Sequence, residues 1–522
     1  MTHRSGKPNI LFLITDQHRP DHVGFGGNET VCTPHLDSIA ARGTVFRQAY
    51  VASPICMPNR ASIMTGRMPS VHGTRFNGIS LDWHANTFVR SLRLAGYRTT
   101  HIGKSHLQTM GVSRQRLRAV LDYTLEEEAL LPAAEDGWDE RENIARYGGG
   151  EVAEEADYYG FERAAFAILH GDQVTGHYEG WLRRQGVDPD RLCGPANALK
   201  RYGGWSQVYQ TALPAELHPS SYVADRTIDE IRAATREGRP FFIHASWPDP
   251  HHPYAPPGDY YDRYVPADMT LPESFHDNHE QSMPHYRHMI ANRGRMVYHN
   301  VDGWAPTEDQ FRHALAAEYG NICLIDDCVG RILRALESAG AADNTIVVFT
   351  SDHGDMFGDH GIMFKHGMHY LGCLRVPLVI SRPGQPHSVT DSLACSLDIG
   401  PTLLELAGVP PFHGMQGLSL LPMLEHPAAV TRQCVYIEED NKFDLTGAGS
   451  STRMRTLVSA DGRLTVYRGH DHGELFGVDD PLEMDNLFST DRGRELRHHQ
   501  MEQLLYQMMR HADESPRPKY NA

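Results

Sequence analysis

The chain has 522 residues, 40% of them hydrophobic, and a formal net charge of −17 at neutral pH. That length allows one large hydrophobic core and a smaller second domain. The negative charge argues against a nucleic-acid partner, because phosphate backbones bind to basic faces. No run reaches the ~18 apolar residues of a membrane span, so no membrane partner is expected.

Two features of the sequence bear on its compartment. The apolar run 10–14 is too short for a signal peptide and leads directly into Asp16, which favours a first buried strand. The eight cysteines form no CxxC pair and are scattered over positions 32, 56, 193, 323, 328, 373, 395 and 434. In a chain of this length, such spacing predicts reduced thiols and a cytoplasmic protein.

Short apolar strands alternate with amphipathic helices along most of the chain. Buried strands are expected at 9–15, at 238–247 and at 344–352. A further strand is expected after Gly96 and ends at about residue 102. Helices are expected at 33–43, 86–95 and 311–339. This alternation predicts an α/β fold with a large, mostly parallel sheet sandwiched by helices.

Two regions depart from that alternation. The stretch 111–220 is rich in Glu, Gly and Tyr and is read as an insertion or lid over the sheet. Near the C-terminus, Asp461-Gly462 stands between two alternating runs, a strong hairpin signal. We therefore expect a catalytic domain over 1–385 and a C-terminal α+β subdomain over 386–522, with an antiparallel sheet and a helical tail.

Two of the predicted strands end in an acidic polar pair, Asp16-Gln17 and Asp352-His353. In a doubly wound sheet, ligands bind beyond the carboxyl ends of the strands. Carboxylates, an amide oxygen and an imidazole suit a hard or borderline divalent cation. Either pair alone would be read as a cap for the next turn. Two pairs at equivalent strand ends favour a metal site.

Basic side chains also follow strand ends. Lys104 and His106 lie just past one strand, and His251 and His252 lie on a proline-rich loop after another. Lys365 follows the second acidic pair. Each of these residues alone is more often a solvated surface residue than a catalyst. Their common position after strand ends predicts that they line the same site.

Cys56 lies two residues before Pro58 and four before Arg60, in the segment SPICMPNRASIMTGR. A cysteine phosphatase would place its arginine further along, so that the intervening amides could surround a phosphate. A metal site would need a second Cys or a His at short spacing. Neither arrangement occurs at Cys56, so its role has to be sought in the whole motif.

The segment CMPNRASIMTGR resembles the CxPxR signature of type I sulfatases, in the alkaline phosphatase superfamily. In that family the cysteine is oxidised after translation to formylglycine. Six further blocks resemble family blocks in the family order: PNILFLITDQ, HIGKSHL, PDPHHPY, LIDDCVGRIL, NTIVVFTSDHGDMFGDHG and ELFGVDDPLEMDNLF. The likeness covers about residues 8–110 and 220–490. Arylsulfatases, choline sulfatases and phosphonate monoester hydrolases are the groups it resembles.

The resemblance implies hydrolysis of a sulfate ester by S–O cleavage, releasing sulfate and an alcohol or phenol. One hydroxyl of hydrated formylglycine at position 56 would attack sulfur, and the other would later expel sulfate. Carried over by position, the ligands of one divalent metal ion would be Asp16, Gln17, Asp352, His353 and an oxygen of residue 56. The implied partners are a small-molecule or sugar sulfate ester and a formylglycine-generating maturation enzyme.

The resemblance also implies roles for the basic residues. Arg60 would hold the modified residue and nearby carboxylates, and Lys104 and Lys365 would neutralise charge on the transferred group. His106 would be the base that triggers elimination of sulfate. His251 would protonate the leaving oxygen.

Three positions leave alternatives open. His252 competes with His251, because the doubled histidine blurs the family's HxP element by one residue. Gln17 and His353 stand where many sulfatases have Asp and Asn. Both variants occur in the family, including in members that favour manganese. Calcium is therefore the expected ion and manganese the alternative.

Two other functions compete with sulfate ester hydrolysis. A phosphonate monoester or phosphodiester hydrolase would use the same scaffold, but its GKSH-like block lacks the pair that is intact here as Lys104 and His106. A non-catalytic binding protein on a decayed sulfatase fold would have lost motif residues, and none is missing. The alcohol and the oligomeric state stay open, with the C-terminal tail as a candidate contact of a homo-oligomer.

Overall fold

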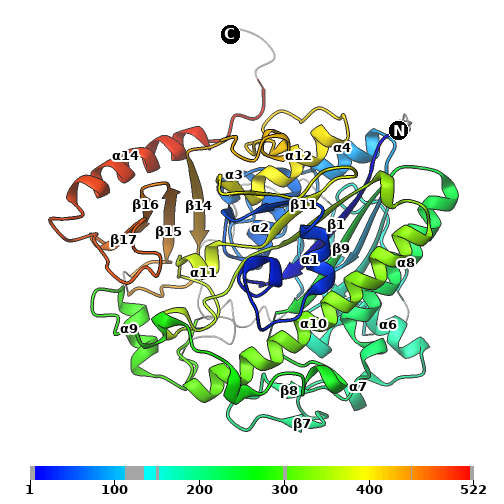
Figure 1. Cartoon of the computed structure of the whole chain (residues 1–522), viewed down its shortest axis with the longest axis horizontal. Helices are drawn as coiled ribbons and strands as arrows, with labels where there is room; N and C mark the ends of the chain where they lie inside the picture. The colour runs from blue at the N-terminus through cyan, green and yellow to red at the C-terminus, as the bar shows by residue number, and fades with distance from the viewer. Residues whose placement is uncertain (1–5, 112–134, 149–151, 298–302, 448, 518–522) are drawn as a thin grey trace.

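The computed structural model describes residues 6–111, 135–148, 152–297, 303–447 and 449–517. Figure 1 shows a large sheet through the middle of the molecule, helices on both sides of it, and a smaller sheet at one end. Within these described ranges, no helix combines the length and the apolar character needed to cross a membrane.

The main sheet has nine strands among the described residues, in the order β12-β2-β11-β10-β1-β9-β4-β5-β6. They are β1 (Asn9–Asp16), β2 (Thr44–Phe46), β4 (Arg98–Gly103), β5 (Arg163–Ile168), β6 (Thr175–Gly176), β9 (Phe241–Pro250), β10 (Thr345–Ser351), β11 (Leu378–Ser381) and β12 (Ser388–Thr390). The neighbours from β10 to β5 run parallel, whereas β11 and β6 run antiparallel to their neighbours. The predicted mostly parallel sheet is confirmed.

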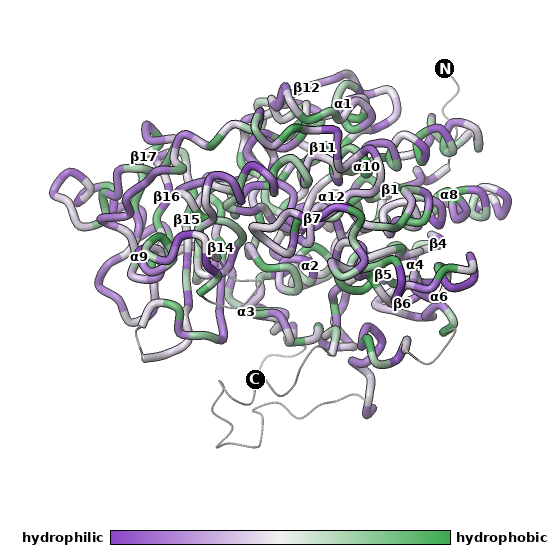
Figure 2. Tube along the Cα trace, turned by 90° about the horizontal axis from the view of Figure 1, so that it is seen from below, coloured by the Kyte–Doolittle hydropathy of each residue, from purple (hydrophilic) through white to green (hydrophobic). Residues whose placement is uncertain are grey.

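Helices cover both faces of this sheet. One face packs against α1 (Pro34–Ala40), α8 (Pro219–Glu237) and α10 (Glu308–Ser338), and the other against α2 (Cys56–Thr65), α4 (Phe88–Leu94) and α12 (Ile399–Leu406). In Figure 2, α8 alternates between hydrophobic and hydrophilic colours along its length. That alternation is typical of a helix with one buried face.

Successive side chains of β1 enter two different cores. Ile10, Phe12 and Ile14 pack with α2, α4 and α12, whereas Leu11 and Leu13 pack with α1, α8 and α10. Successive side chains of a strand point to opposite faces, so a strand covered on both faces needs a continuous apolar run. The sequence ILFLI meets this need.

Smaller elements fill the connections between these strands and helices. They are β3 (Ala49–Tyr50), β7 (Lys200–Arg201), β8 (Tyr209–Gln210), β13 (Ala394–Cys395), α3 (Pro69–His72), α6 (His177–Arg184), α7 (Pro189–Leu192), α9 (Pro284–Ala291), α11 (Leu371–Leu374) and α13 (Leu421–Glu425). The eight cysteines are all free thiols.

The C-terminal sheet is antiparallel, as predicted. Its strands are β14 (Cys434–Asp440), β15 (Arg453–Ser459), β16 (Gly462–Tyr467) and β17 (Gly473–Gly477), and α14 (Arg494–Arg510) packs beside them. Ser459 pairs with Gly462, so residues 460–461 form a two-residue hairpin turn. A Cβ atom on Gly462 would meet the Phe476 carbonyl oxygen at 2.1 Å, which explains the glycine.

The prediction that 111–220 is an insertion over the sheet is wrong for β5 and β6. Both are strands of the main sheet, and β5 pairs in parallel with β4. The β5 sequence RAAFAI contains three alanines, which have little preference for strands. Pairing with β4 therefore decides its conformation. Residues 112–134 and 149–151 of the predicted insertion lie outside the described residues.

A domain boundary at residue 385 remains a proposal. β12 and α12 follow that position in the chain, yet β12 pairs with β2 of the main sheet and α12 packs on the main core.

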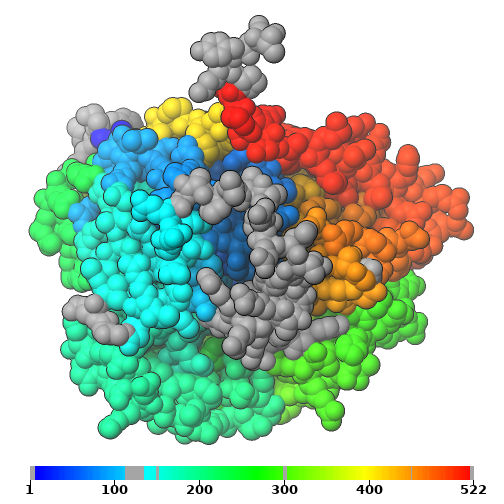
Figure 3. Space-filling view, turned by 180° about the vertical axis from the view of Figure 1, so that it is seen from behind, coloured from blue at the N-terminus to red at the C-terminus, as the bar shows by residue number. Residues whose placement is uncertain are grey.

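On the face shown in Figure 3, a blue N-terminal part of the chain lies at the bottom of a hollow between cyan and orange segments.

Candidate active site

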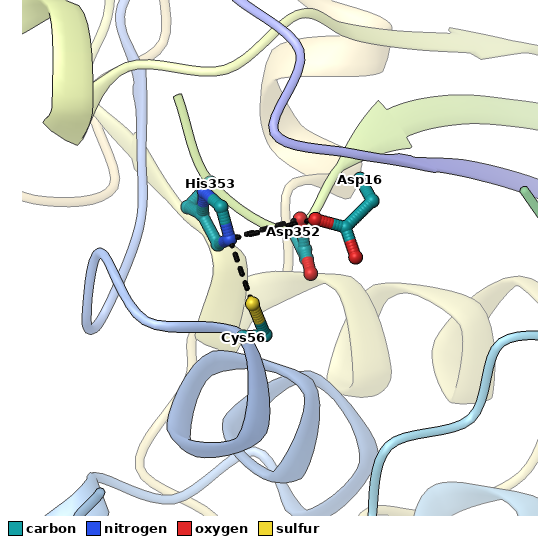
Figure 4. Close-up of side chains that lie close together, drawn as sticks. All are labelled: Asp16, Cys56, Asp352 and His353. Atoms are coloured by element: carbon teal, nitrogen blue, oxygen red, sulfur yellow. Dashed lines mark hydrogen bonds and ion pairs between the residues drawn. The ribbon is translucent and has the colours of Figure 1, made fainter. Parts of the chain in front are cut away.

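The two acidic pairs meet at one edge of the main sheet. Asp16 ends β1, Asp352 directly follows β10, and these strands are parallel neighbours. The backbone N–H of Gln17 donates to Asp352 Oδ1 at 3.0 Å. One ligand atom each from Asp16, Cys56, Asp352 and His353 lies within 4.8 Å of the others, as Figure 4 shows. The structure thus brings four predicted site residues to one point.

Cys56 is the first residue of α2, a helix whose residues are all buried. Pro58 fits here because the first turn of a helix needs no backbone donor, and Gly66 ends the helix at a φ of 65°. Cys56 Sγ lies 3.1 Å from His353 Nε2 and 3.4 Å from Lys365 Nζ. Burial alone would raise the pKa of the thiol, but Lys365 and Lys104 outweigh burial and lower it.

Arg60 lies one turn after Cys56 on the same face of α2. Its Nε donates to Asp352 Oδ2 at 2.7 Å, and its Nη2 donates to Asp16 Oδ2 at 3.3 Å. Its Nη1 donates to the Lys104 carbonyl at 2.7 Å. Burial would raise the pKa of Asp352, but Arg60, His353 and Lys104 together lower it. One guanidinium therefore ties both strand ends to α2.

One carboxylate oxygen in this group accepts no hydrogen bond from a described residue, and His353 Nε2 lies 3.7 Å from it. Asp16 Oδ2 accepts from Lys104 Nζ and Arg60, whereas Asp16 Oδ1 has no hydrogen bond to any described residue and Asp16 is fully buried. A buried unpaired carboxylate oxygen is unfavourable. His353 Nδ1 lies 2.8 Å from the Gly354 carbonyl oxygen and donates to it, which leaves the Nε2 lone pair directed at the group. This donor set fits a bound cation.

Gln17 has a φ of 59°, and both ends of its side-chain amide are held. Lys365 Nζ donates to Gln17 Oε1 at 2.6 Å and to His353 Nε2 at 2.8 Å. Gln17 Nε2 donates to Asp355 Oδ2. Asp355 was not predicted as a site residue, although it follows Asp352 by three residues within the same family-like block.

Lys104 and His106 both reach the site from the loop after β4. Lys104 Nζ contacts Asp16, and the His106 ring interacts with the Cys56 thiol. Burial lowers the pKa of His106. Glu142 accepts the backbone N–H groups of residues 106, 107 and 108. It fixes this loop and was missed because it lies in the stretch read as an insertion.

The two neighbouring histidines differ in their ring contacts. The His251 ring lies 3.7 Å from the ring of His170, centroid to centroid, whereas the His252 ring stacks on Phe364 at 3.9 Å, and the two histidine rings stack on each other at 4.4 Å. Ligand atoms of Asp16, His170 and His251 lie within 4.8 Å of one another, so His251 belongs to the site. His170 follows β5, and the sequence offered no signal for it beyond its place after a strand.

Comparisons with known proteins agree with this geometry. A family model described as Sulfatase matches residues 8–409, and one described as N-sulphoglucosamine sulphohydrolase, C-terminal, matches residues 358–511. An arylsulfatase of Clostridium perfringens is 29% identical over 94% of this chain and 92% of its own length. A choline-sulfatase of Rhizobium meliloti is 27% identical over 94% of this chain and 84% of its own length.

Solved structures share the fold. The phosphonate monoester hydrolase SpPMH from Silicibacter pomeroyi superposes with a TM-score of 0.80 at 24% identity, covering 98% of this chain and 96% of that one. At that identity the likeness concerns the fold alone. The sulfatase match, in contrast, spans most of the sequence and includes the described site. The chain therefore belongs to the sulfatase family, in the alkaline phosphatase superfamily, and is a sulfuric ester hydrolase.

Proposed function

We propose that the protein hydrolyses sulfate esters through formylglycine at position 56 and one bound divalent metal ion. One observation carries this proposal. Cys56 begins a buried helix among Arg60, Asp352 and His353, beside an Asp16 oxygen that accepts no hydrogen bond from a described residue. In the unmodified chain, Cys56 Sγ stands in for the hydroxyl oxygens of hydrated formylglycine.

The proposed metal ligands are Asp16, Gln17, Asp352 and His353, with an oxygen of residue 56. The ion would acidify the attacking hydroxyl and polarise a sulfate oxygen. Lys365 now donates to two proposed ligand atoms, so metal binding would replace those hydrogen bonds. The oxygen donors suit Ca²⁺, the ion that we propose, and the imidazole makes Mn²⁺ the alternative.

The reaction would begin with one hydroxyl of residue 56 attacking sulfur as the S–O bond to the alcohol breaks. We propose that His251 gives the leaving oxygen its proton. Burial and the neighbouring His170 hold the pKa of His251 well below its ordinary value. A bound sulfate group brings negative charge next to the ring and raises this pKa, so that protonation accompanies substrate binding.

The second step would release sulfate. His106 takes the proton from the remaining hydroxyl, the bond between carbon and the sulfate oxygen breaks, and the aldehyde forms again. The burial that lowers the pKa of His106 keeps its ring uncharged at neutral pH, as a base requires. Lys104 and Lys365 would stabilise the charge that develops on the transferred group in both steps, and Arg60 would hold the carboxylates in place.

We propose a small-molecule or sugar sulfate ester as the substrate, since the relatives include an arylsulfatase, a choline-sulfatase and an N-acetylglucosamine-6-O-sulfatase. A formylglycine-generating enzyme would be a partner during maturation. The eight free thiols support a cytoplasmic location. Exposed apolar side chains on α14, among them Leu505 and Met509, support a homo-oligomer.

The proposal is tested on one metal-loaded preparation. Mass spectrometry of a peptide covering residues 53–60 should show the aldehyde in place of the thiol. The same preparation is assayed with an aryl sulfate, a sugar sulfate, choline sulfate and phenylphosphonate. Sulfate esters should be turned over faster than the phosphonate. Faster turnover of phenylphosphonate would favour the phosphonate monoester hydrolase alternative, and no turnover would favour a binding protein.

A further inference from the structure

The loop that carries Lys365 has a constrained backbone. Phe364, His366 and Gly367 have φ values of 73°, 78° and 74°. This left-handed region is unfavourable for residues with a Cβ atom, so Phe364 and His366 need contacts from outside the loop to keep it. An added Cβ on Gly367 would meet Leu445 Cδ1 at 2.7 Å. The surroundings therefore set the conformation of this loop.

Side chains from two other elements hold the backbone of Gly367. Its N–H donates to Glu439 Oε1 of β14 at 2.7 Å. Its carbonyl oxygen accepts from His285 Nε2 at 2.7 Å and from the Tyr286 hydroxyl at 3.3 Å, both on α9. All three side chains are buried. Gly367 follows Lys365 by two residues, so these bonds fix the backbone from which the lysine extends.

A chain of hydrogen bonds connects Glu439, through His369, Thr456 and Thr465, to Arg463. His369 Nε2 lies 3.2 Å from Glu439 Oε2, and His369 Nδ1 lies 2.6 Å from Thr456 Oγ1. The hydroxyls of Thr456 and Thr465 lie 2.7 Å apart, and Arg463 Nη1 donates to Thr465 Oγ1 at 2.7 Å. These side chains are buried at the interface between the C-terminal sheet and the loop.

The donors and acceptors of these hydrogen bonds can be assigned in one consistent direction. A carboxylate can only accept, so His369 donates to Glu439 Oε2 from Nε2, and in the singly protonated ring Nδ1 accepts from the Thr456 hydroxyl. Thr456 has then used its one proton, so Thr465 donates to Thr456 and accepts from Arg463. The C-terminal sheet therefore presents a carboxylate of fixed orientation to the loop.

We propose that Glu439 is a positioning residue for Lys365, acting through Gly367, and that the C-terminal sheet thereby sets the geometry of the active site. The inference rests on the role of Lys365 under the proposed function. Lys365 Nζ lies 3.4 Å from Cys56 Sγ. A shift of the loop would move this ammonium away from the group being transferred, which lowers kcat more than it weakens substrate binding.

The test compares Glu439→Gln with Glu438→Gln in the mature, metal-loaded enzyme. The amide introduced at position 439 would set an N–H donor against the N–H of His369. We expect kcat on nitrophenyl sulfate to fall by ~10–10²-fold, as for a small misplacement of a catalytic group, with KM nearly unchanged. Glu438 is also buried but bonds to Ser70 and Tyr436, so its variant should keep kcat. A loss of kcat that is equal in both variants would overturn the proposal.

Combination with Lys365→Ala separates this inference from the proposed function. If Glu439 acts only through Lys365, the double variant should be no slower than Lys365→Ala alone. Additive losses would overturn the inference and leave the role of Lys365 intact. Full activity of Lys365→Ala would refute the proposed role itself. His369→Gln, which interrupts the same chain from the other side, should repeat the kcat loss and replaces Glu439→Gln if that variant does not fold.

Discussion

The Sγ atom of Cys56 lies 3.1 Å from Nε2 of His353, although 297 positions separate the two residues in the chain. Cys56 begins α2, and His353 follows β10. Because His353 Nδ1 donates to the Gly354 carbonyl, its Nε2 lone pair points towards residue 56. Residue 56 and the proposed metal ligands therefore form one unit, in which a change at one member should affect the others.

Substitutions of Cys56 should separate the two steps of the proposed reaction. Cys56→Ala should abolish turnover while leaving the fold and the affinity for the metal ion in place. Cys56→Ser should accumulate a sulfated enzyme, because a single hydroxyl can attack sulfur but cannot expel sulfate from carbon. Intact-protein mass spectrometry after incubation with substrate measures the adduct. Full activity in a preparation whose Cys56 is entirely thiol would refute the formylglycine mechanism.

Asp16→Asn should weaken binding of the divalent ion by at least ~10²-fold, because it removes a charged ligand whose Oδ1 accepts no hydrogen bond from a described residue. Calorimetric titration of metal-free protein with Ca²⁺ and with Mn²⁺ measures the affinity and shows which ion binds more tightly. Asp398→Asn is the control, since Asp398 is equally buried but belongs to no candidate metal group among the described residues and accepts from Arg432 and the Leu418 N–H. Equal affinities in the two variants would exclude Asp16 as a ligand.

His251→Ala should slow alkyl sulfates by ~10²–10⁴-fold, as loss of a general acid does. It should affect nitrophenyl sulfate less, because nitrophenolate leaves without a proton. His252→Ala is the comparison variant: its ring stacks on Phe364 and also on the His251 ring at 4.4 Å, but it is not a member of the group formed by Asp16, His170 and His251. The measurement is kcat/KM for both substrates in each variant. Equal losses on both substrates would point to a binding role for His251.

Asp249 should make stability depend on pH. Burial raises the pKa of its carboxyl to about 7, above the ~3.9 of an unfolded chain. The stability from the protonated carboxyl is therefore fully present below pH ~4 and is lost as the pH rises to about 7.

Asp249→Asn has no proton to lose at this position. Its free energy of unfolding relative to wild type should rise between pH ~4 and about 7, by up to ~4 kcal/mol, and then stay level. Urea unfolding of both proteins at pH 5 and pH 8 measures this change. Parallel pH profiles would show that the carboxyl titrates normally.

Local sequence patterns were enough to predict much of the scaffold. The expected strand 9–15 is β1 (Asn9–Asp16), and the expected helix 311–339 is α10 (Glu308–Ser338). A continuous apolar run indicates a buried strand, and apolar residues spaced three to four apart indicate a helix with one buried face. Both patterns involve only residues that are close together in the sequence. The same is true of the hairpin turn, which needs only two alternating runs and turn residues between them.

The region around β5 shows where such patterns fail. RAAFAI is half alanine and has Ile168 as its one β-branched residue, so its strand conformation follows from pairing with β4. Because β5 was missed, so were His170, which follows it, and Glu142, which holds the loop after β4. Contacts of this kind depend on the order of strands in the sheet, which local periodicity does not encode.

The sequence by itself determined the elements, the residue types at the strand ends and the family-like motif around Cys56. Only the tertiary structure decided which of these residues meet: it placed His251 beside His170, left one oxygen of Asp16 without a hydrogen bond from a described residue, and brought Glu439 to the Lys365 loop. The reason is physical. Burial and periodicity are properties of neighbouring residues, whereas a site at a sheet edge is assembled by strand pairing and side-chain packing between segments far apart in the chain.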